Sequence, residues 1–300
     1  MSVDARALPA SGAAGAGGRT AARAARRPPA ATGAAVVLLL VCAAAVTAPW
    51  IAPHDPREQV LERRLLPPAW TSGGNWAFAL GSDHLGRDIL SRLIYGSRIS
   101  LVVGISAVAI SGLLGVTVGL VAGYYGGRLD GLIMRLVDIQ LAFPFILLAI
   151  TVVAVLGAGL RNVILVLGIA GWMVYARVVR GQVLALKEKE FVVAARALGA
   201  ANHVIIPRHL LPNVMTPVII VATFAVATNI ITEASLSFLG LGVEPRIPTW
   251  GSMLADGRAY IGRAWWLTTF PGLAILFTVL SINVLGDWLR DRLDPRLRNL

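Results

Sequence analysis

Long apolar runs separated by polar or charged segments dominate the pattern of this 300-residue chain. A bilayer core about 30 Å thick requires about 20 apolar residues in a helix that rises 1.5 Å per residue. Runs of roughly this length recur along the chain, so each is expected to be a transmembrane helix. Their ranges are 34–51, 101–127, 139–160, 163–179, 214–236 and 267–285. The pattern therefore predicts an all-α integral membrane protein with six transmembrane helices.

Two of the predicted helices carry residues that affect their shape or packing. Pro144 lies within the third run and predicts a kink there. Four of the glycines in the second run favour close contact with a neighbouring helix. These are Gly104, Gly112, Gly115 and Gly119.

The remaining segments divide the chain into parts. Residues 1–33 are rich in Ala, Gly, Pro and Arg, which is typical of a disordered basic tail. Residues 34–97 comprise the first helix and a polar extracytoplasmic segment, residues 98–288 form the main membrane domain, and residues 289–300 form a C-terminal tail. A signal peptide is the competing interpretation of the first run, because a basic start and small residues at 45–48 also fit one.

Composition and charge support a membrane protein. Hydrophobic residues make up 56% of the chain and charged residues only 14%, whereas soluble proteins have about 25% charged residues. The net charge of +11 is spread between the apolar runs and forms no single patch, so it indicates membrane topology and not nucleic-acid binding. An even number of spans puts both termini on one side, and the positive-inside rule predicts that this side is the cytoplasm. The single Cys42 excludes an intrachain disulfide and a cysteine-based metal site.

A charged segment at residues 187–212 separates the fourth and fifth runs. Phe191, Ala194, Ala195 and Leu198 follow helical spacing and form one apolar stripe. Such a stripe beside the membrane could contact another protein, whereas a solvated loop is the alternative interpretation.

The second half of this segment contains turn and capping residues. Gly199 permits a break or a close approach, and Asn202 is expected to cap a second short helix. Pro207 and Pro212 limit how far that helix can extend. Together the two halves predict a helix–turn–helix on the membrane surface.

The same segment resembles the cytoplasmic loop of permease subunits of binding-protein-dependent ABC importers. That loop reads E-A-A, three residues, G, nine residues, I-x-L-P; here Val193 replaces the Glu and His209 replaces the Ile. The resemblance implies the type I importer fold, in which this loop forms coupling helices that sit in a groove of the ATPase subunit. The residues implied in coupling are Phe191, Ala194, Ala195, Leu198, Gly199, His209, Leu211 and Pro212.

Further strings resemble the dipeptide, oligopeptide and nickel branch of that family. They are L-G-S-D-H-L-G-R-D from Leu80, F-L-G-L-G from Phe238 and W-G-S-M-L from Trp250. The resemblance implies a bacterial inner-membrane permease that imports dipeptides or oligopeptides, with nickel chelates, glutathione or haem as alternatives. It also implies a second, homologous permease in a heterodimer, two cytoplasmic ATPases and an extracytoplasmic solute-binding protein.

Glu233 is the most informative polar residue within a predicted span. Asn229, Glu233 and Ser237 are four residues apart and share one helix face. An ionisable group at the bilayer centre costs about 2.5–3.5 kcal/mol, so this face is expected to line the translocation path. Alternatively, Glu233 lies near the outer interface and pairs with Arg246 or Arg258.

Two other groups of charged residues are interpreted as structural. Asp83, His84 and Asp88 could suggest a metal site, but with Arg87 and Arg92 beside them we favour a capped, ion-paired helix start and predict no metal.

Near the inner end of the third run, Asp138 is expected to pair with Arg135.

Motifs for catalysis and cofactor binding are missing from the sequence. Neither Lys187 nor Lys189 follows a glycine, so the chain has no P-loop of its own, and H-E-x-x-H and G-x-S-x-G motifs are also missing. We therefore expect a transport subunit without a cofactor, and ATP hydrolysis by partner subunits. A secondary transporter is the alternative outside this class, although it should show internal repeats. An intramembrane enzyme would require a paired nucleophile and base or metal ligands within the spans.

Overall fold

The computed structural model describes residues 29–244 and 246–293, and helices dominate this part of the chain. The long helices are α2 (Pro29–Ile51), α3 (Ile89–Tyr125), α6 (Leu160–Leu186), α9 (Leu211–Phe238) and α11 (Trp266–Leu293). The shorter α-helices are α4 (Gly127–Ala142), α5 (Phe145–Leu156), α7 (Glu190–Ala197), α8 (Asn202–Ile205) and α10 (Trp250–Gly257). Three single turns of 3₁₀-helix are η1 (Leu61–Arg63), η2 (Trp76–Phe78) and η4 (Arg258–Tyr260), and η3 (Ile206–Leu210) is a π-helix.

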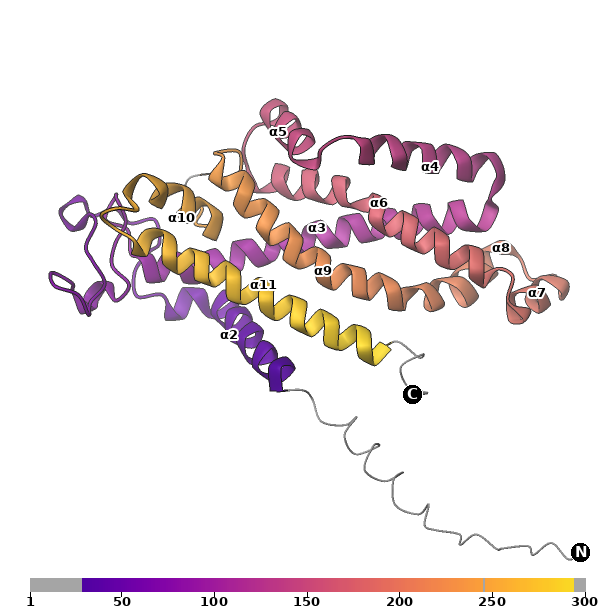
Figure 1. Ribbon diagram of the computed structural model, residues 1–300, viewed down its shortest axis with the longest axis horizontal. Coiled ribbons are helices and arrows are strands. Elements are labelled where there is room, and N and C mark those ends of the chain that lie inside the picture. The colour runs from indigo at the N-terminus through magenta and orange to yellow at the C-terminus, as the bar shows by residue number, and fades with distance from the viewer. Residues whose placement is uncertain (1–28, 245, 294–300) are drawn as a thin grey trace, which may run out of the picture.

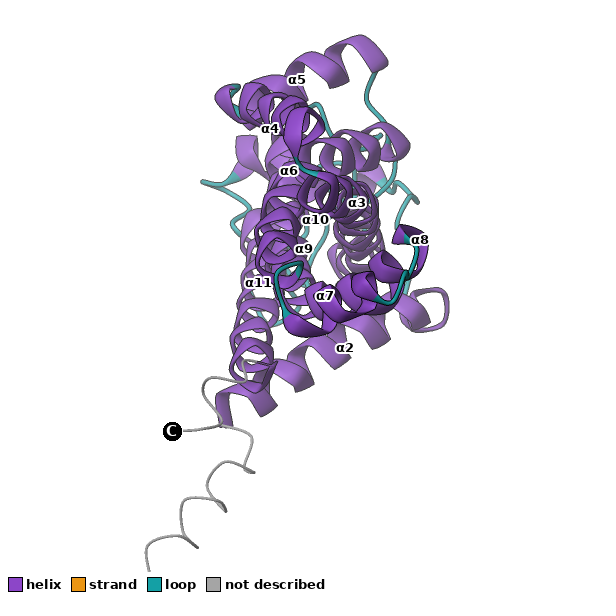
Figure 2. Ribbon diagram, turned by 90° about the vertical axis from the view of Figure 1, so that its right-hand side faces the viewer, coloured by secondary structure: helices purple, strands orange, loops and turns teal. Residues whose placement is uncertain are grey.

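The long helices form an elongated bundle with two different ends (Figure 1). At one end, which we call the loop end, residues 52–88 and α10 are gathered. At the opposite end α7 and α8 project from the bundle, and the view along the bundle in Figure 2 shows them in front of the long helices. We call residues 187–212, which contain α7 and α8, the ledge.

The prediction of a helical membrane protein is confirmed. Among the described residues, α2, α3, α6, α11 and the stretch 202–238 are each long and apolar enough to cross a membrane, which makes five helices. The pair α4 and α5 provides a sixth span if the two are counted as one. Residues 1–28 of the predicted basic tail lie outside the described residues. Residues 29–33 form the start of α2. Of the C-terminal tail, residues 289–293 belong to α11.

The third predicted span is broken and not merely kinked. α4 and α5 meet at an angle of 88°. Phe143 between them is extended, with φ −85° and ψ 131°, because the ring of the following Pro144 disfavours a helical conformation at this position. The break therefore follows from the proline. The helix before it, α4, carries four charged residues and so does not stand out as an apolar run in the sequence.

Glycines allow α3 to pack closely against α6. A Cβ atom at Gly115 would lie 2.3 Å from the carbonyl oxygen of Trp172, and one at Gly119 would lie 2.7 Å from that of Ala176. Gly104 similarly faces α9, with Ile230 at 3.1 Å from the position of its missing Cβ. The expected close contacts are therefore present, and they hold α3 and α6 together along much of their length.

These distances predict opposite effects of the same substitution at two positions of α3. Gly119→Ala should destabilise the protein by about 1–3 kcal/mol, because the new methyl group would contact the backbone of α6 and force the helices apart. Gly112→Ala is the matched control, since its Cβ would meet only Tyr175 at 3.8 Å. Thermal unfolding in detergent should show a lower Tm for Gly119→Ala only, and equal Tm values would contradict this packing.

Ion pairs attach α4 to α6. Arg180 Nε lies 2.5 Å from Asp130 Oδ1, and Arg177 Nη2 lies 2.6 Å from Asp138 Oδ1. The predicted pairing of Asp138 with Arg135 is therefore wrong, because α4 turns Asp138 toward the neighbouring helix. Charged residues on this face of α4 are thus used to hold the broken span against the bundle.

Candidate functional site

The ledge begins where α6 ends and consists of two short helices joined by a turn. Gly199 forms the turn with φ +81°, a left-handed conformation that favours glycine. The amide of Gly199 donates to the carbonyl of Arg196, and the amide of Ala200 donates to that of Ala195, both at 3.0 Å. This pair of bonds is a Schellman ending for α7. A Cβ at Gly199 would meet nothing within 4 Å, so the turn needs glycine for its backbone conformation and not for close approach.

The apolar stripe of α7 faces outward. Val192 on the opposite side is fully buried against α3, α6 and η3. Phe191 is 44% exposed and Leu198 is 88% exposed. Ala194 is exposed and Ala195 is half-buried. α7 therefore attaches to the bundle by one face and presents a small apolar surface on the other, as expected of a contact for another protein.

The second half of the ledge differs from the prediction. Ala201, not Asn202, occupies the N-cap of α8, and its side chain makes no capping bond. Asn202 instead accepts a hydrogen bond from the Tyr124 hydroxyl, with 2.6 Å between Oη and Oδ1. No local sequence pattern predicts this bond, because Tyr124 belongs to α3, which is far away in the chain.

Pro207 does not end the helix. It lies near the start of the π-helix η3, which continues directly into α9, and Pro212 lies in the first turn of α9. A π-turn accommodates the missing N–H of proline because the regular bonding is already interrupted there. Residues 202–238 are therefore one continuous helical stretch.

Residues from both halves of the ledge meet. His209 is half-buried, and its ring centroid lies 6.2 Å from that of Phe191. Leu211 is half-buried and Pro212 is exposed. The predicted coupling residues thus lie on one projecting element of the fold.

The three polar residues of α9 separate into two environments. Asn229 lines a cavity of about 370 Å³ between α3, α5, α6 and α9, together with apolar side chains and a few hydroxyl groups. Those hydroxyl-bearing residues are Ser111, Tyr175, Thr228 and Thr232. Glu233 is fully buried and does not line this cavity. It accepts a hydrogen bond of 2.7 Å from the Ser237 hydroxyl.

Neither arginine proposed as a partner of Glu233 pairs with it. The Arg258 guanidinium lies over the ring of Phe238, 5.2 Å from the centroid. Arg246 lines a separate cavity at the loop end. Glu233 therefore forms no ion pair within the described residues, and the expected pairing with Arg246 or Arg258 is wrong.

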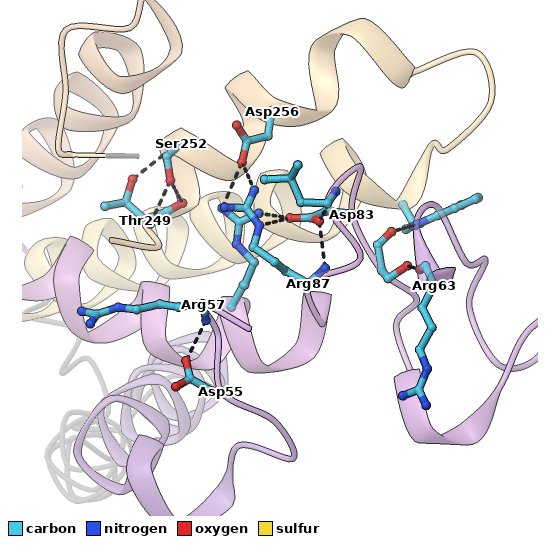
Figure 3. Close-up of polar contacts among 12 residues, drawn as sticks. Asp55, Arg57, Arg63, Asp83, Arg87, Thr249, Ser252 and Asp256 are labelled. Atoms are coloured by element: carbon cyan, nitrogen blue, oxygen red, sulfur yellow. Dashed lines mark hydrogen bonds and ion pairs between the residues drawn. The ribbon is translucent and has the colours of Figure 1, made fainter. Parts of the chain in front are cut away.

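At the loop end, two arginines and two aspartates form an ion-pair cluster in which only Asp256 is partly exposed, and Figure 3 labels Asp83, Arg87 and Asp256. Asp83 accepts hydrogen bonds from Arg87 Nε at 2.5 Å and from Arg92 Nη1. Asp256 Oδ2 accepts from Arg87 Nη2 at 2.8 Å and from Arg92 Nη2 at 3.0 Å. The cluster joins the segment before α3 to α10.

The charges of this cluster balance. Burial by itself would raise the pKa of Asp83, but Arg92, Arg87 and the amides of Arg87 and Leu85 together hold the pKa below its usual value.

Asp88 Oδ2 accepts from the amide of Ser91 at 2.8 Å and so caps α3. This arrangement is the capped, ion-paired helix start that the sequence favoured. Asp256 was missed, because it comes from the opposite end of the chain.

Oxygen and nitrogen atoms of Asp83, His84 and Asp256 lie within 4.8 Å of one another, a spacing that a metal ion could use. Both carboxylates are already bound by guanidinium groups, whose positive charges would repel a cation. These residues are therefore better suited to holding the loop end together than to binding a metal.

Comparisons with known proteins are consistent with this geometry. A family model described as the binding-protein-dependent transport system inner membrane component matches residues 115–299. A model described as the N-terminal TM domain of oligopeptide transport permease C matches residues 18–68. Among solved structures, the inward-facing MetNI methionine ABC transporter is similar with a TM-score of 0.56 and 22% identity, over 68% of this chain and 96% of that chain.

Curated relatives are similar over most of their length. The di/tripeptide transport system permease protein DppC of Pseudomonas aeruginosa is 49% identical over 255 residues, which are 85% of this chain and 84% of the relative. The glutathione transport system permease protein GsiD of Pectobacterium atrosepticum is 44% identical over 85% of this chain and 83% of the relative.

Proposed function

Because this chain belongs to the binding-protein-dependent transport system inner membrane components, the permeases of ABC importers, we propose that it forms half of a peptide translocation path and that its ledge couples that path to a separate ATPase. The observation that supports the coupling role best is the exposed apolar face of α7. Leu198 is 88% exposed at the end of α7, which is attached to the bundle through the fully buried Val192.

Family membership implies an ATPase and a substrate-binding protein as partners. We propose further that the complete importer contains a second, homologous permease and two ATPases. In this arrangement the ledge and both termini lie in the cytoplasm, and the loop end faces the binding protein. The basic residues of the N-terminal segment and the ledge support this orientation through the positive-inside rule.

The path itself is proposed to include the cavity between α3, α5, α6 and α9. Its hydroxyl groups and Asn229 provide hydrogen-bonding partners in an otherwise apolar wall, which suits a solute with peptide groups. Glu233 and Ser237 lie beyond this cavity toward the loop end, so within the path we assign them to its outer part.

Dipeptides or short oligopeptides are the proposed substrates. The support is the identity of 49% to a permease named for di- and tripeptide transport. A permease named for glutathione transport is also 44% identical, and glutathione is itself a small peptide, so it is the second candidate. Nickel chelates and haem remain further alternatives, with no particular observation that favours them.

Reconstitution tests this function. Liposomes should contain this chain with its partner permease and ATPases, and the loaded binding protein should be added with a labelled dipeptide. We expect uptake only when ATP is present, and no uptake when an ion gradient replaces ATP. Transport by this chain alone, or uptake that depends on the ion gradient without ATP, would exclude the proposal in favour of a secondary transporter.

A further inference from the structure

Helix α3 connects the two ends of the molecule without interruption. It contains 37 residues and is therefore about 55 Å long. At the loop end Arg92 lies in the buried ion-pair cluster, with its side chain 1% exposed. The carbonyl of the next residue, Leu93, accepts a hydrogen bond of 3.0 Å from the indole of Trp250, the first residue of α10. The start of α3 is thus attached to α10 by both charge and hydrogen bonding.

At the other end of α3, the side chain of Tyr124 contacts the ledge. The Tyr124 hydroxyl donates to Asn202 Oδ1 at 2.6 Å, which reaches α8. The Arg196 guanidinium of α7 lies over the Tyr124 ring, 5.7 Å from its centroid. Tyr124 therefore contacts both short helices of the ledge at once, and it is only 9% exposed.

Close packing along α3 makes this connection stiff. Gly123, next to Tyr124, approaches Val183 of α6 so closely that an added Cβ would lie 2.8 Å from the Val183 Cβ. Lys187 Nζ also donates to the Gly123 carbonyl at 3.3 Å. A displacement of α3 at this point must therefore move the ledge as well.

From these contacts we propose that Tyr124 is a positioning residue that transmits a movement of α3, begun at the loop end, to the ledge. This inference rests on the proposed function, in which the loop end faces the binding protein and the ledge contacts the ATPase. Docking of the loaded binding protein would shift α10 and the start of α3, and the Tyr124–Asn202 bond would carry that shift to the ATPase.

The test compares two adjacent tyrosines in the complete importer. Tyr124→Phe keeps the ring and removes only the hydroxyl that donates to Asn202. Tyr125→Phe is the matched control, because Tyr125 is 55% exposed. The readout is the ratio of ATPase rates with and without loaded binding protein, measured on complexes purified with all subunits.

For Tyr124→Phe we expect this ratio to fall about fivefold, as for the loss of one hydrogen bond, and for Tyr125→Phe no change. A merely structural role for Tyr124 would lower the Tm and both rates together, leaving the ratio as in the unsubstituted protein. Equal ratios in the two variants would overturn the inference.

Substitutions of Asn202 distinguish the bond from the ring contact. Asn202→Asp retains an oxygen that can accept from Tyr124 and should keep the ratio, whereas Asn202→Leu should lower it as Tyr124→Phe does. The double variant Tyr124→Phe/Asn202→Leu should be no worse than either single variant, because all three lack the same bond. If the losses in the ATPase ratio were additive in the double variant, the effects could not both come from the Tyr124–Asn202 bond.

The control that separates the two proposals is the unsubstituted importer. If its ATPase does not respond to the binding protein, the proposed function fails, whereas a normal response that Tyr124→Phe leaves unchanged refutes only the role of Tyr124.

Discussion

Substitution of Gly199 by valine is expected to reduce ATP-driven uptake at least tenfold while the chain still inserts into the membrane. Gly199 has φ +81°, which costs a residue with a Cβ atom about 1–2 kcal/mol and a β-branched residue more. Since a difference of 1.4 kcal/mol is a factor of ten in an equilibrium, this strain is enough to displace α7 from its position. The apolar face that we assign to ATPase contact would then be misaligned.

Two further variants test this explanation. Gly181→Val is the matched control, because Gly181 also has open space around its missing Cβ but lies within the regular helix α6. Gly199→Asn should have an intermediate effect, since asparagine tolerates the left-handed region better than valine does. Uptake and co-purification of the ATPase are measured in each case. Normal uptake by Gly199→Val would contradict the proposed role of the ledge in coupling to the ATPase.

Substitution of Arg92 by leucine should have the largest effect on stability. The Arg92 side chain is 1% exposed and binds both Asp83 and Asp256. Removing one partner from a buried ion-pair network typically costs about 3–5 kcal/mol, because the remaining charges are left buried without compensation. We expect a lower Tm in detergent and faster proteolysis of the segment 52–88.

Arg98→Leu provides the comparison, because Arg98 lies on the same helix but is exposed, and its Tm should be unchanged. Arg92→Lys should be intermediate, since an ammonium group lacks the planar fork with which arginine binds two carboxylates. Similar Tm values for Arg92→Leu and Arg98→Leu would mean that the cluster does not hold the loop end together.

Much of the membrane architecture could be read from the sequence, because hydrophobic burial in a bilayer imposes long apolar runs. The glycine-lined contact of α3 with α6 and the turn at Gly199 were also predictable, since each depends on local chemistry that glycine alone provides. The break before Pro144 was recognised only as a kink, because the size of a bend depends on what packs around it.

Long-range polar contacts were not predictable in the same way. Asp256 lies more than 160 positions from Arg87 and Arg92, and only the folded bundle brings them together. Asp138 was assigned to a nearby arginine in sequence, whereas the folded chain offers Arg177. Glu233, Asn229 and Ser237 share a helix, but neighbouring helices give them different surroundings, which spacing alone does not reveal.

The π-helix at Ile206–Leu210 connects the ledge to α9, so its length sets the rotation of the α9 residues that line the cavity relative to the ledge. Since an α-helix advances about 100° per residue, deletion of a single residue there would rotate Asn229 a quarter of a turn or more out of its present place in the lining. Length changes in this turn are thus forbidden by geometry even where side chains are interchangeable. The two surfaces that we propose to contact the ATPase and the solute can therefore change their side chains but not their relative position along and around the helix.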